Sequence, residues 1–534
     1  MKPIQNLDLG FSDAENYRSK SQRDLFNKIF VKNSFLDQLF EENRQFLVGE
    51  KGTGKTAYSV FLSSNNYRNT VSDLRYLRET DYQKFLVLKE EKQLALTEFA
   101  SIWKVIILLL MAKSIREDEI NNNIFTKRGK LKAVIEAIDD YYNHAFSPEI
   151  VNVLQFVENS KVAAELIAKY LKAGGESSTE THFSESRYQT NLLYIENSLK
   201  AALTGIKLKW NHFLFIDGID IRPGSIPFPI YLECVKGLAN AAWSLNQDFF
   251  SNIKDSTGRF KAIVLIRPDI FNSLGLQNAS NKLSDNSVFL DWRTTYPAHR
   301  TSELFLLSST LLSAQQKEIY LPSDCWDFYF GWPARSQTAL SQESAFCEML
   351  RISYSRPRDI VRILNLLQEE QKRTSSELAH FDSKVFYSDP FKNAYSQYLM
   401  GGVRDQLSFY YNETEYDIFL KFFHYLNGRI EFTYEEFLKA YSNYATVLEK
   451  ARNAMPVFMG SADSFLQFLY DSNVICYMEF LDDKPYYSFC YRDRSASNAS
   501  PKVKDGVTYR IHQGLHKELK VGYGAKTPSR NPIE

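Results

Sequence analysis

The chain has 534 residues, of which 44% are hydrophobic, 14% aromatic and 24% charged. This length predicts about two to four domains, and the hydrophobic content predicts large cores and excludes wholesale disorder. Lysine plus arginine equals aspartate plus glutamate, at 64 each. The net charge therefore gives no general attraction to nucleic acid or to a membrane, although it does not exclude a local basic patch.

The cysteines and the first residues bear on the cellular compartment. The five cysteines lie far apart and form no C-x-x-C pair, so neither a zinc ribbon nor a redox pair is indicated. Isolated cysteines with apolar neighbours are typical of reduced core residues. Residues 1–6 lack the apolar stretch of a signal peptide, so we expect a cytoplasmic protein with no membrane partner.

A phosphate-binding motif follows the first predicted strand. Residues 1–45 are mostly helical by pattern, and their last helix would form a wall of a base pocket or simply pack in the core. Residues 46–48 are a short apolar strand, residues 49–56 match G-x-x-x-x-G-K-[ST], and a helical run starts at Ala57. In that context the glycine-rich turn presents backbone N–H groups to a phosphate, although a chance match in an ordinary turn is the alternative.

The motif predicts ATP and Mg²⁺ as cofactors. We expect Lys55 to reach the β- and γ-phosphates and Thr56 to place its hydroxyl on the magnesium ion. No N-K-x-D box for guanine is evident, so adenine is favoured. The other residues expected to hold the nucleotide are Gly49, Lys51, Gly52, Thr53, Gly54 and Ala57.

A long helical region is predicted after a short strand at residues 85–88. It runs over about 95–205 as an insertion, with breaks near residues 121–123 and 173–185, and the polar stretch 173–181 reads as a loop. Its most apolar part, Val105–Ala112, is too short to span a bilayer. We interpret it as a buried helix, with a membrane-surface helix as the alternative.

Two strong strands follow, at residues 212–217 and 261–267, with a shorter one at 288–292. Apolar runs rich in β-branched residues are typical of strands that are covered on both faces. Because helical segments separate these strands, the sequence predicts an α/β fold with a mainly parallel P-loop sheet flanked by helices. A helical lid at about 300–370 would complete a core at residues 1–370, followed by a helical linker at 371–410.

Acidic residues at the end of the strand 212–217 are the candidate metal and catalytic groups. Asp217 follows the buried residues 213–216, where a carboxylate is costly unless it meets a cation such as Mg²⁺. Asp220 lies three residues on and is a candidate to polarise the attacking water. The alternative for both is an Asp-Gly turn with surface carboxylates.

Three arginines are candidate phosphate ligands. Arg267 ends the strand 261–267, at the sheet edge where ligands bind, and would sense the γ-phosphate or else pair with Asp269. Arg356 and Arg358 flank a proline at a predicted helix start. Positive charges there interact unfavourably with the helix dipole, so an external anion would stabilise them. They would contact nucleotide, or pair with a neighbouring acid, Asp359 or Glu303.

The C-terminal region, 411–534, has a different character. Helices at about 416–423, 434–444 and 464–469 precede strands at 474–478 and 486–491, which is the order of a winged helix. The third helix, 464–471, carries no lysine or arginine, which argues against reading a DNA groove and favours protein contact. His512 and His516 are four residues apart, but no third metal ligand is in register, so a surface helix is expected there.

Four segments together resemble the FunZ-type bacterial P-loop ATPases, which are similar to the STAND and KAP branches of the AAA-related division. They are residues 49–57, 217–220, 266–271 and 356–359, and the resemblance spans roughly residues 20–370. It implies a regulatory or phage-defence ATPase that forms homo-oligomers and acts on a protein partner or effector. Many hydrolases of this division have a glutamate after the metal-binding aspartate, where this chain has Gly218, and this departure implies slow turnover or a base from elsewhere.

Two functions follow as hypotheses. The first is an ATP-driven switch or motor, with Lys55, Asp217, Asp220 and Arg267 as catalytic residues and Thr56 and Asp217 as magnesium ligands. In this hypothesis Arg267 and the segment with Arg356 and Arg358 report the γ-phosphate state to the C-terminal domain. The second is a nucleic-acid-binding regulator in which the nucleotide is structural, and it predicts DNA binding that weakens steeply with salt.

Overall fold

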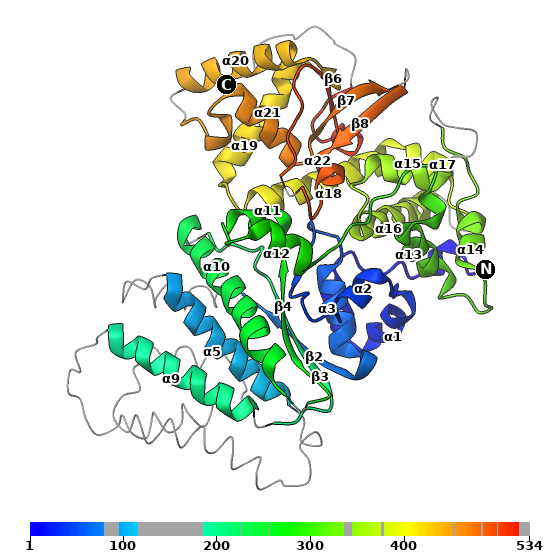
Figure 1. Ribbon diagram of the computed structural model, residues 1–534. Helices are drawn as coiled ribbons and strands as arrows, with labels where there is room; N and C mark the ends of the chain where they lie inside the picture. Colours follow the sequence, from blue (N-terminus) through cyan, green and yellow to red (C-terminus); the bar gives the residue numbers. More distant parts are fainter. Residues whose placement is uncertain are drawn as a thin grey trace, which may run out of the picture. The chain divides into compact units, whose positions relative to one another are not determined.

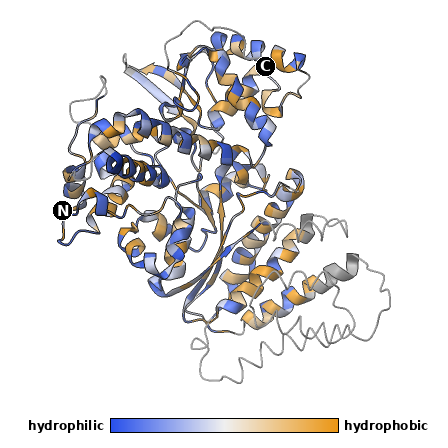
Figure 2. Cartoon of the chain, turned by 180° about the vertical axis from the view of Figure 1, so that it is seen from behind, coloured by the Kyte–Doolittle hydropathy of each residue, from blue (hydrophilic) through white to orange (hydrophobic). Residues whose placement is uncertain are grey.

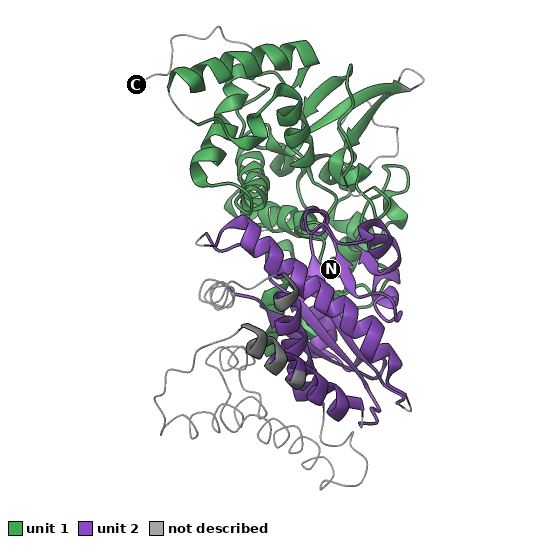
Figure 3. Ribbon diagram, turned by 60° about the vertical axis from the view of Figure 1, so that its left-hand side comes forward, with its two compact units in different colours: residues 1–33, 50–54, 291–534 green, residues 34–49, 55–290 purple. Residues whose placement is uncertain are grey.

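The computed structural model describes residues 1–78, 96–115, 185–335 and 344–522, except residues 205, 225, 255, 375–378, 452–453, 482–483 and 499. The described chain divides into two compact units (Figure 3). The first unit contains residues 1–33, 50–54 and 291–534, and the second contains residues 34–49 and 55–290.

The second unit is built on a five-stranded parallel sheet in the order β2-β3-β4-β1-β5, of which β2, β3 and β4 are labelled in Figure 1. The two longest central strands are almost wholly buried, as continuous apolar runs predict. The strands are β1 (Phe46–Val48), β2 (Thr70–Tyr76), β3 (Asn211–Asp217), β4 (Phe260–Ile266) and β5 (Ser287–Phe289).

Helices flank this sheet. The apolar helix α5 (Leu96–Ser114) packs against α10 (Phe228–Ser244) and α9 (Glu185–Thr204), and α3 (Lys55–Ser64) packs against β2 (Figure 1). Hydrophobic residues dominate β3, β4 and α5 (Figure 2), and residues 105–112 are buried, so the predicted buried helix is confirmed. The shorter elements are α2 (Ser34–Gln38), η3 (Tyr67–Asn69), the π-helical turn η5 (Leu245–Phe249), η6 (Phe250–Asn252), α11 (Pro268–Ser273) and α12 (Ala279–Asp285).

The predicted α/β class and parallel sheet are therefore confirmed, and β2 is an additional strand that sequence reasoning missed. β2 pairs in register with β3, from Thr70 opposite Asn211 to Tyr76 opposite Asp217. Three predictions lie outside the described residues: the strand at 85–88, the break at 121–123 and the loop at 173–181. The break predicted at 173–185 also lies outside them, apart from residue 185, where α9 begins. The predicted insertion at 95–205 consequently stays a prediction between α5 and α9.

The first unit contains helices in the N-terminal residues 1–33 and further helices after residue 291. The predicted helical lid at 300–370 corresponds to α13, α14, α15 and most of α16, and it belongs to this unit together with the C-terminal residues. The helices are η1 (Ile4–Asn6), η2 (Ala14–Arg18), α1 (Lys20–Ile29), η7 (His299–Thr301), α13 (Glu303–Ser313), α14 (Pro322–Tyr329), α15 (Ala345–Ile352), α16 (Pro357–Thr374), α17 (Ser383–Tyr387) and α18 (Asp389–Leu407).

The C-terminal part of the first unit joins helices to a four-stranded antiparallel sheet in the order β6-β9-β7-β8. Three predicted helices and both predicted strands are present, and the helices bury a cluster of phenylalanines. The elements are α19 (Glu413–Phe422), η8 (Phe423–Leu426), β6 (Glu431–Phe432), α20 (Tyr434–Lys450), η9 (Val457–Met459), α21 (Ala462–Asp471), β7 (Ile475–Leu481), β8 (Lys484–Phe489), α22 (Cys490–Asp493), β9 (Thr508–Ile511) and η10 (Gln513–Leu515).

Two further expectations are settled by the fold. The surface helix expected around His512 and His516 is wrong, because His512 is buried at the end of β9 and the following residues form only the short turn η10. Among the helices of the described residues, none is both long and apolar enough to cross a membrane.

Candidate functional site

The phosphate loop connects β1 to α3, as its motif predicts. Gly52 and Gly54 have φ angles of +92° and +95°, a backbone conformation that glycine adopts without strain. Gly49 begins the loop, and its N–H donates to the carbonyl of Ile266 at the end of β4 (3.2 Å). Lys55 opens α3, and its buried Nζ donates to the carbonyl of Gly49 (2.8 Å). The lysine side chain therefore turns back over the loop, and Ala57 lies behind it within α3.

The fold brings Thr56 and Asp217 together from segments far apart in the chain. The Thr56 hydroxyl donates to Oδ2 of Asp217 (2.7 Å), and Oδ1 of Asp217 accepts the N–H of Gly218 (2.8 Å). The strand register accounts for this, since β3 and β4 pair in parallel and β4 pairs with β1, so that all three end at one edge. A hydroxyl and a carboxylate at this separation are the hard oxygen ligands that Mg²⁺ prefers.

Asp217 is 7% exposed, and its surroundings disfavour the charged form of its carboxyl. Burial, followed by repulsion from Asp220, raises its pKa to about 6, while the hydrogen bond from Thr56 and the charge of Lys55 act in the opposite direction. Asp220 is therefore close enough to act on Asp217 electrostatically. A divalent cation next to Asp217 would relieve both the desolvation and the repulsion.

Gly218 cannot be replaced by a glutamate in this backbone. Its φ is +87°, and a Cβ at this position would lie 2.5 Å from the carbonyl oxygen of Leu77 and 3.1 Å from its nitrogen. The Leu77 N–H donates to the carbonyl of Asp217 (2.9 Å), which extends the pairing of β2 with β3 to this point. The missing glutamate is thus a consequence of how the backbone of β2 closes over the end of β3.

Arg267 forms an ion pair with Asp269, which was the partner expected as the alternative to a γ-phosphate. It is 1% exposed at the end of β4, and its Nε donates to Oδ1 of Asp269 (3.0 Å) while Nη2 donates to Oδ2. A bidentate pair of this kind fixes the guanidinium plane. The pair with Asp269 is what the structure shows, and the γ-phosphate contact of Arg267 stays a prediction.

Residues 50–54 of the loop make their tertiary contacts within the first unit. Three successive loop carbonyls accept hydrogen bonds there: Lys51 from Nη1 of Arg356 (2.7 Å), Gly52 from the N–H of Arg358 (3.3 Å), and Thr53 from Nε1 of Trp292 (2.8 Å). Because a trans peptide points its C=O and its N–H in opposite directions, the N–H groups of Gly52 and Gly54 face away from these donors.

Two side chains of the loop are also paired in the first unit. Glu50 forms an ion pair with Arg494, and the two side chains are 13% and 5% exposed. Lys51 pairs with Asp405 at 2.7 Å, where both side chains are more open to solvent, at 33% and 59%. The carbonyl of Glu50 accepts from both the N–H (3.2 Å) and the hydroxyl (2.8 Å) of Thr53, which closes the turn of the loop.

Arg356 and Arg358 differ in their surroundings. Arg356 pairs with the fully buried Asp359 through two hydrogen bonds of 2.9 and 3.1 Å, as the alternative reading expected. Arg358 donates from Nε to the carbonyl of Ser12 (2.8 Å). Both arginines therefore hold protein groups, Arg356 through its side chain and Arg358 also through its backbone N–H, and their contact with nucleotide stays a prediction.

Sequence reasoning missed Glu50, Trp292 and Arg494 as partners of the loop. Glu50 occupies a position where the motif accepts any residue, and Trp292 and Arg494 lie 239 and 444 residues from their partners in the loop. No local pattern signals pairs at such separations. Comparisons of the chain with protein-family models, with curated proteins and with solved structures gave no match.

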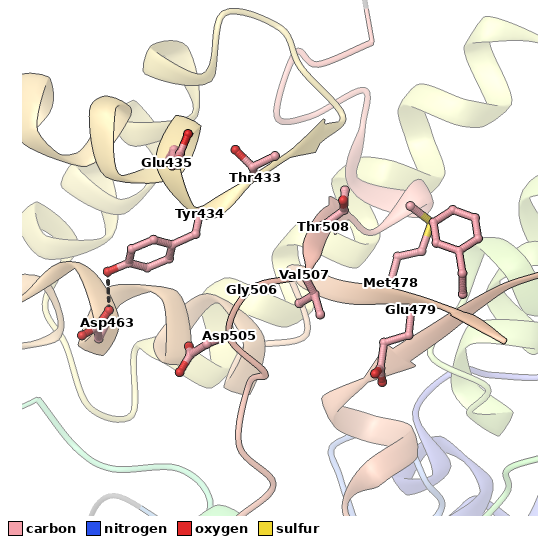
Figure 4. Close-up of a pocket in the computed structure, with 11 residues that line it drawn as sticks. Thr433, Tyr434, Glu435, Asp463, Met478, Glu479, Asp505, Gly506, Val507 and Thr508 are labelled. Carbon is pink, nitrogen blue, oxygen red and sulfur yellow. Dashed lines mark hydrogen bonds between the residues drawn. The ribbon is translucent and has the colours of Figure 1, made fainter.

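A second feature lies in the C-terminal part of the first unit. A cleft of about 950 Å³ is bordered by the start of α20, by β7 and by the segment before β9 (Figure 4). Four of its lining residues are acidic, and its described lining contains no lysine or arginine; Tyr434 donates its hydroxyl to Asp463 there (2.5 Å). Glu479 pairs with Lys504, and the other three carboxylates would repel a phosphate backbone. The carboxylates are Glu435, Asp463, Glu479 and Asp505.

Proposed function

We propose that this protein is a magnesium-dependent P-loop ATPase that works as a nucleotide-driven switch. The observation that carries the proposal is the 2.7 Å contact between Thr56 and Asp217 at the end of a phosphate loop. Lys55 would hold the β- and γ-phosphates, and the N–H groups of Gly52 and Gly54 would surround the phosphate from the side opposite their carbonyl partners. Magnesium would replace the Thr56 proton as the partner of Asp217.

Turnover is proposed to be slow. The position after Asp217 has no room for a glutamate base, because the backbone of Leu77 occupies it. Asp220 is the candidate to orient water, since it lies three residues on and acts electrostatically on Asp217. A site that binds a triphosphate well and hydrolyses it slowly suits a switch, whose output depends on how long each nucleotide state lasts.

The C-terminal region is proposed to be a winged-helix-like domain that contacts a protein partner. Its order of helix, strand, two helices and a strand pair supports this fold, with β9 added between β6 and β7. The acidic cleft and the absence of lysine and arginine from α21 favour protein over DNA, so the nucleic-acid regulator is the weaker alternative. The homo-oligomer and the role in bacterial regulation or phage defence rest on the family resemblance, and the cytoplasmic location rests on the five buried, widely spaced cysteines.

The proposal is tested by replacing the phosphate-loop lysine. Lys55→Ala removes the charge that faces the β- and γ-phosphates, and we expect magnesium-dependent ATP hydrolysis to fall by about a hundredfold or more, as for other electrostatic contacts to a transferring group. Phosphate release is measured in parallel for the exposed-site control Lys254→Ala, which should match the wild type. Equal turnover in Lys55→Ala and wild type, with both folded, rejects the proposal.

A further inference from the structure

We propose that Arg494 is a positioning residue of the nucleotide loop and that it acts through Glu50. This inference rests on the proposed function and deepens it, because it names the residue that links the C-terminal domain to the phosphate loop. The link is contained in the first unit, since Glu50 and Arg494 both belong to it. Glu50 occupies a variable position of the phosphate-loop motif, and Arg494 lies outside the four segments that carry the family resemblance.

Of the two ion pairs described for residues 50–54, the Glu50–Arg494 pair is the more buried. The Arg494 side chain is 5% exposed and the Glu50 side chain 13%, whereas the Lys51–Asp405 pair is largely open to solvent. Exposed pairs contribute little, because water screens them and the side chains lose conformational freedom. Breaking one partner of a buried pair instead leaves an uncompensated charge. We therefore expect loss of the Glu50–Arg494 pair to disturb the conformation of the loop more than loss of the Lys51–Asp405 pair.

The backbone around Glu50 converts this contact into a constraint on the loop. The carbonyl of Glu50 accepts from the N–H and the hydroxyl of Thr53, so the position of residue 50 determines that of residue 53. The carbonyl of Thr53 is in turn held by Trp292. The peptide of residues 53 and 54 lies between these contacts, and the N–H of Gly54 points away from Trp292. A shift of Glu50 would consequently turn the N–H groups that a phosphate needs.

Arg494 is fixed by the C-terminal sheet. It follows α22, and its N–H donates to the carbonyl of Cys490 (2.9 Å), directly after β8. The neighbouring Tyr491 is held by its own N–H to the side chain of Asn473, next to β7 (2.8 Å). A rearrangement of β7 and β8 would move Arg494 with them. By linkage, an effector that shifts this sheet would change nucleotide affinity, and nucleotide would change the affinity for that effector by the same factor.

The test is a double-mutant cycle on the full chain, with Mg²⁺·ATP affinity measured by calorimetry. Glu50→Gln and Arg494→Gln remove one charge each, and we expect each to weaken binding about tenfold, while the double variant should be no weaker than either single, because all three lose one shared interaction. Arg494→Lys, which keeps the charge, should retain part of the affinity. The matched control Asp405→Asn breaks the exposed pair of the same loop and should stay within about twofold of wild type.

Thermal melting without nucleotide separates positioning from general instability. The proposal requires the variants that lose affinity to melt cooperatively, so that the affinity of the folded protein is what has changed. Unchanged affinity in both single variants, or losses that multiply in the double variant, would overturn the role of Arg494. Wild-type protein that binds no Mg²⁺·ATP would instead refute the proposed function itself, so the two failures are distinguishable.

Discussion

At the scale of single residues, the candidate site depends on oxygen atoms placed by strand register. Lys55, Thr56 and Asp217 were predicted from the sequence because each belongs to a local pattern: a phosphate-loop motif, or a carboxylate that ends an apolar run. Local patterns give residue types but not partners. The bidentate contact of Arg267 with Asp269 was one of two open alternatives until the backbone was known.

Gly218 yields a prediction about stability. In Gly218→Ala the new Cβ meets the carbonyl of Leu77 at 2.5 Å, and alanine must adopt a φ of +87°. We expect a loss of roughly 2 kcal/mol or more in the free energy of unfolding, measured by denaturant titration. Gly224→Ala is the control, because its Cβ meets nothing within 4 Å, and it should change stability by less than about 0.5 kcal/mol. Equal stability of the two variants would show that the backbone of Leu77 yields.

At the scale of elements, the strands that were predicted are those with unbroken apolar runs, β1, β3, β4 and β5. β2 was missed because Ser72, Asp73 and Arg75 interrupt its apolar residues, and as an edge strand it is only partly buried. Its strand character comes from pairing with β3 along its length, which is a tertiary effect. The helical pattern predicted at about 300–370 matches α13, α14, α15 and most of α16, because amphipathic periodicity is a local signal.

The end of β9 carries a pH-sensitive group. His512 is 1% exposed and lies against Tyr354, with ring centroids 4.6 Å apart. Burial, and then the charges of His516, Arg492 and Arg356, lower its pKa from the usual 6.5 to about 3. Below pH 6.5 His512 binds a proton in the unfolded chain but stays neutral in the folded chain. The free energy of unfolding is therefore at its highest above pH 6.5 and decreases as the pH falls toward 3.

We expect this group to cost the fold about 1.4 kcal/mol for each pH unit below 6.5, which is the free energy of one proton. His512→Asn keeps an acceptor for the N–H of Gly514, which Nδ1 now accepts (3.2 Å), but does not titrate. Urea unfolding at pH 7, 6 and 5 should therefore show a shallower decline in the variant than in the wild type. Parallel declines would mean that His512 is protonated in the folded protein.

At the scale of the whole chain, the grouping of residues 50–54 with residues 291–534 was beyond sequence reasoning. Trp292, Arg356 and Arg358 hold three successive loop carbonyls, and Arg494 holds the side chain of Glu50. These partners are separated from the loop by hundreds of residues, and none is specified by the phosphate-loop motif. The fold class could be predicted from periodicity, whereas the constraints on the loop required the folded chain.

The central claim is that a triphosphate and its magnesium ion bind at Lys55, Thr56 and Asp217. Calorimetric titration of ATP with and without Mg²⁺ tests it most directly, on the wild type and on Asp217→Asn, which keeps an acceptor for the Thr56 hydroxyl but removes the charge. We predict saturable, magnesium-enhanced binding in the wild type and a loss of about tenfold or more of the magnesium enhancement in the variant. No heat from the wild type at millimolar ATP and Mg²⁺, or the same magnesium enhancement in both proteins, would contradict the claim.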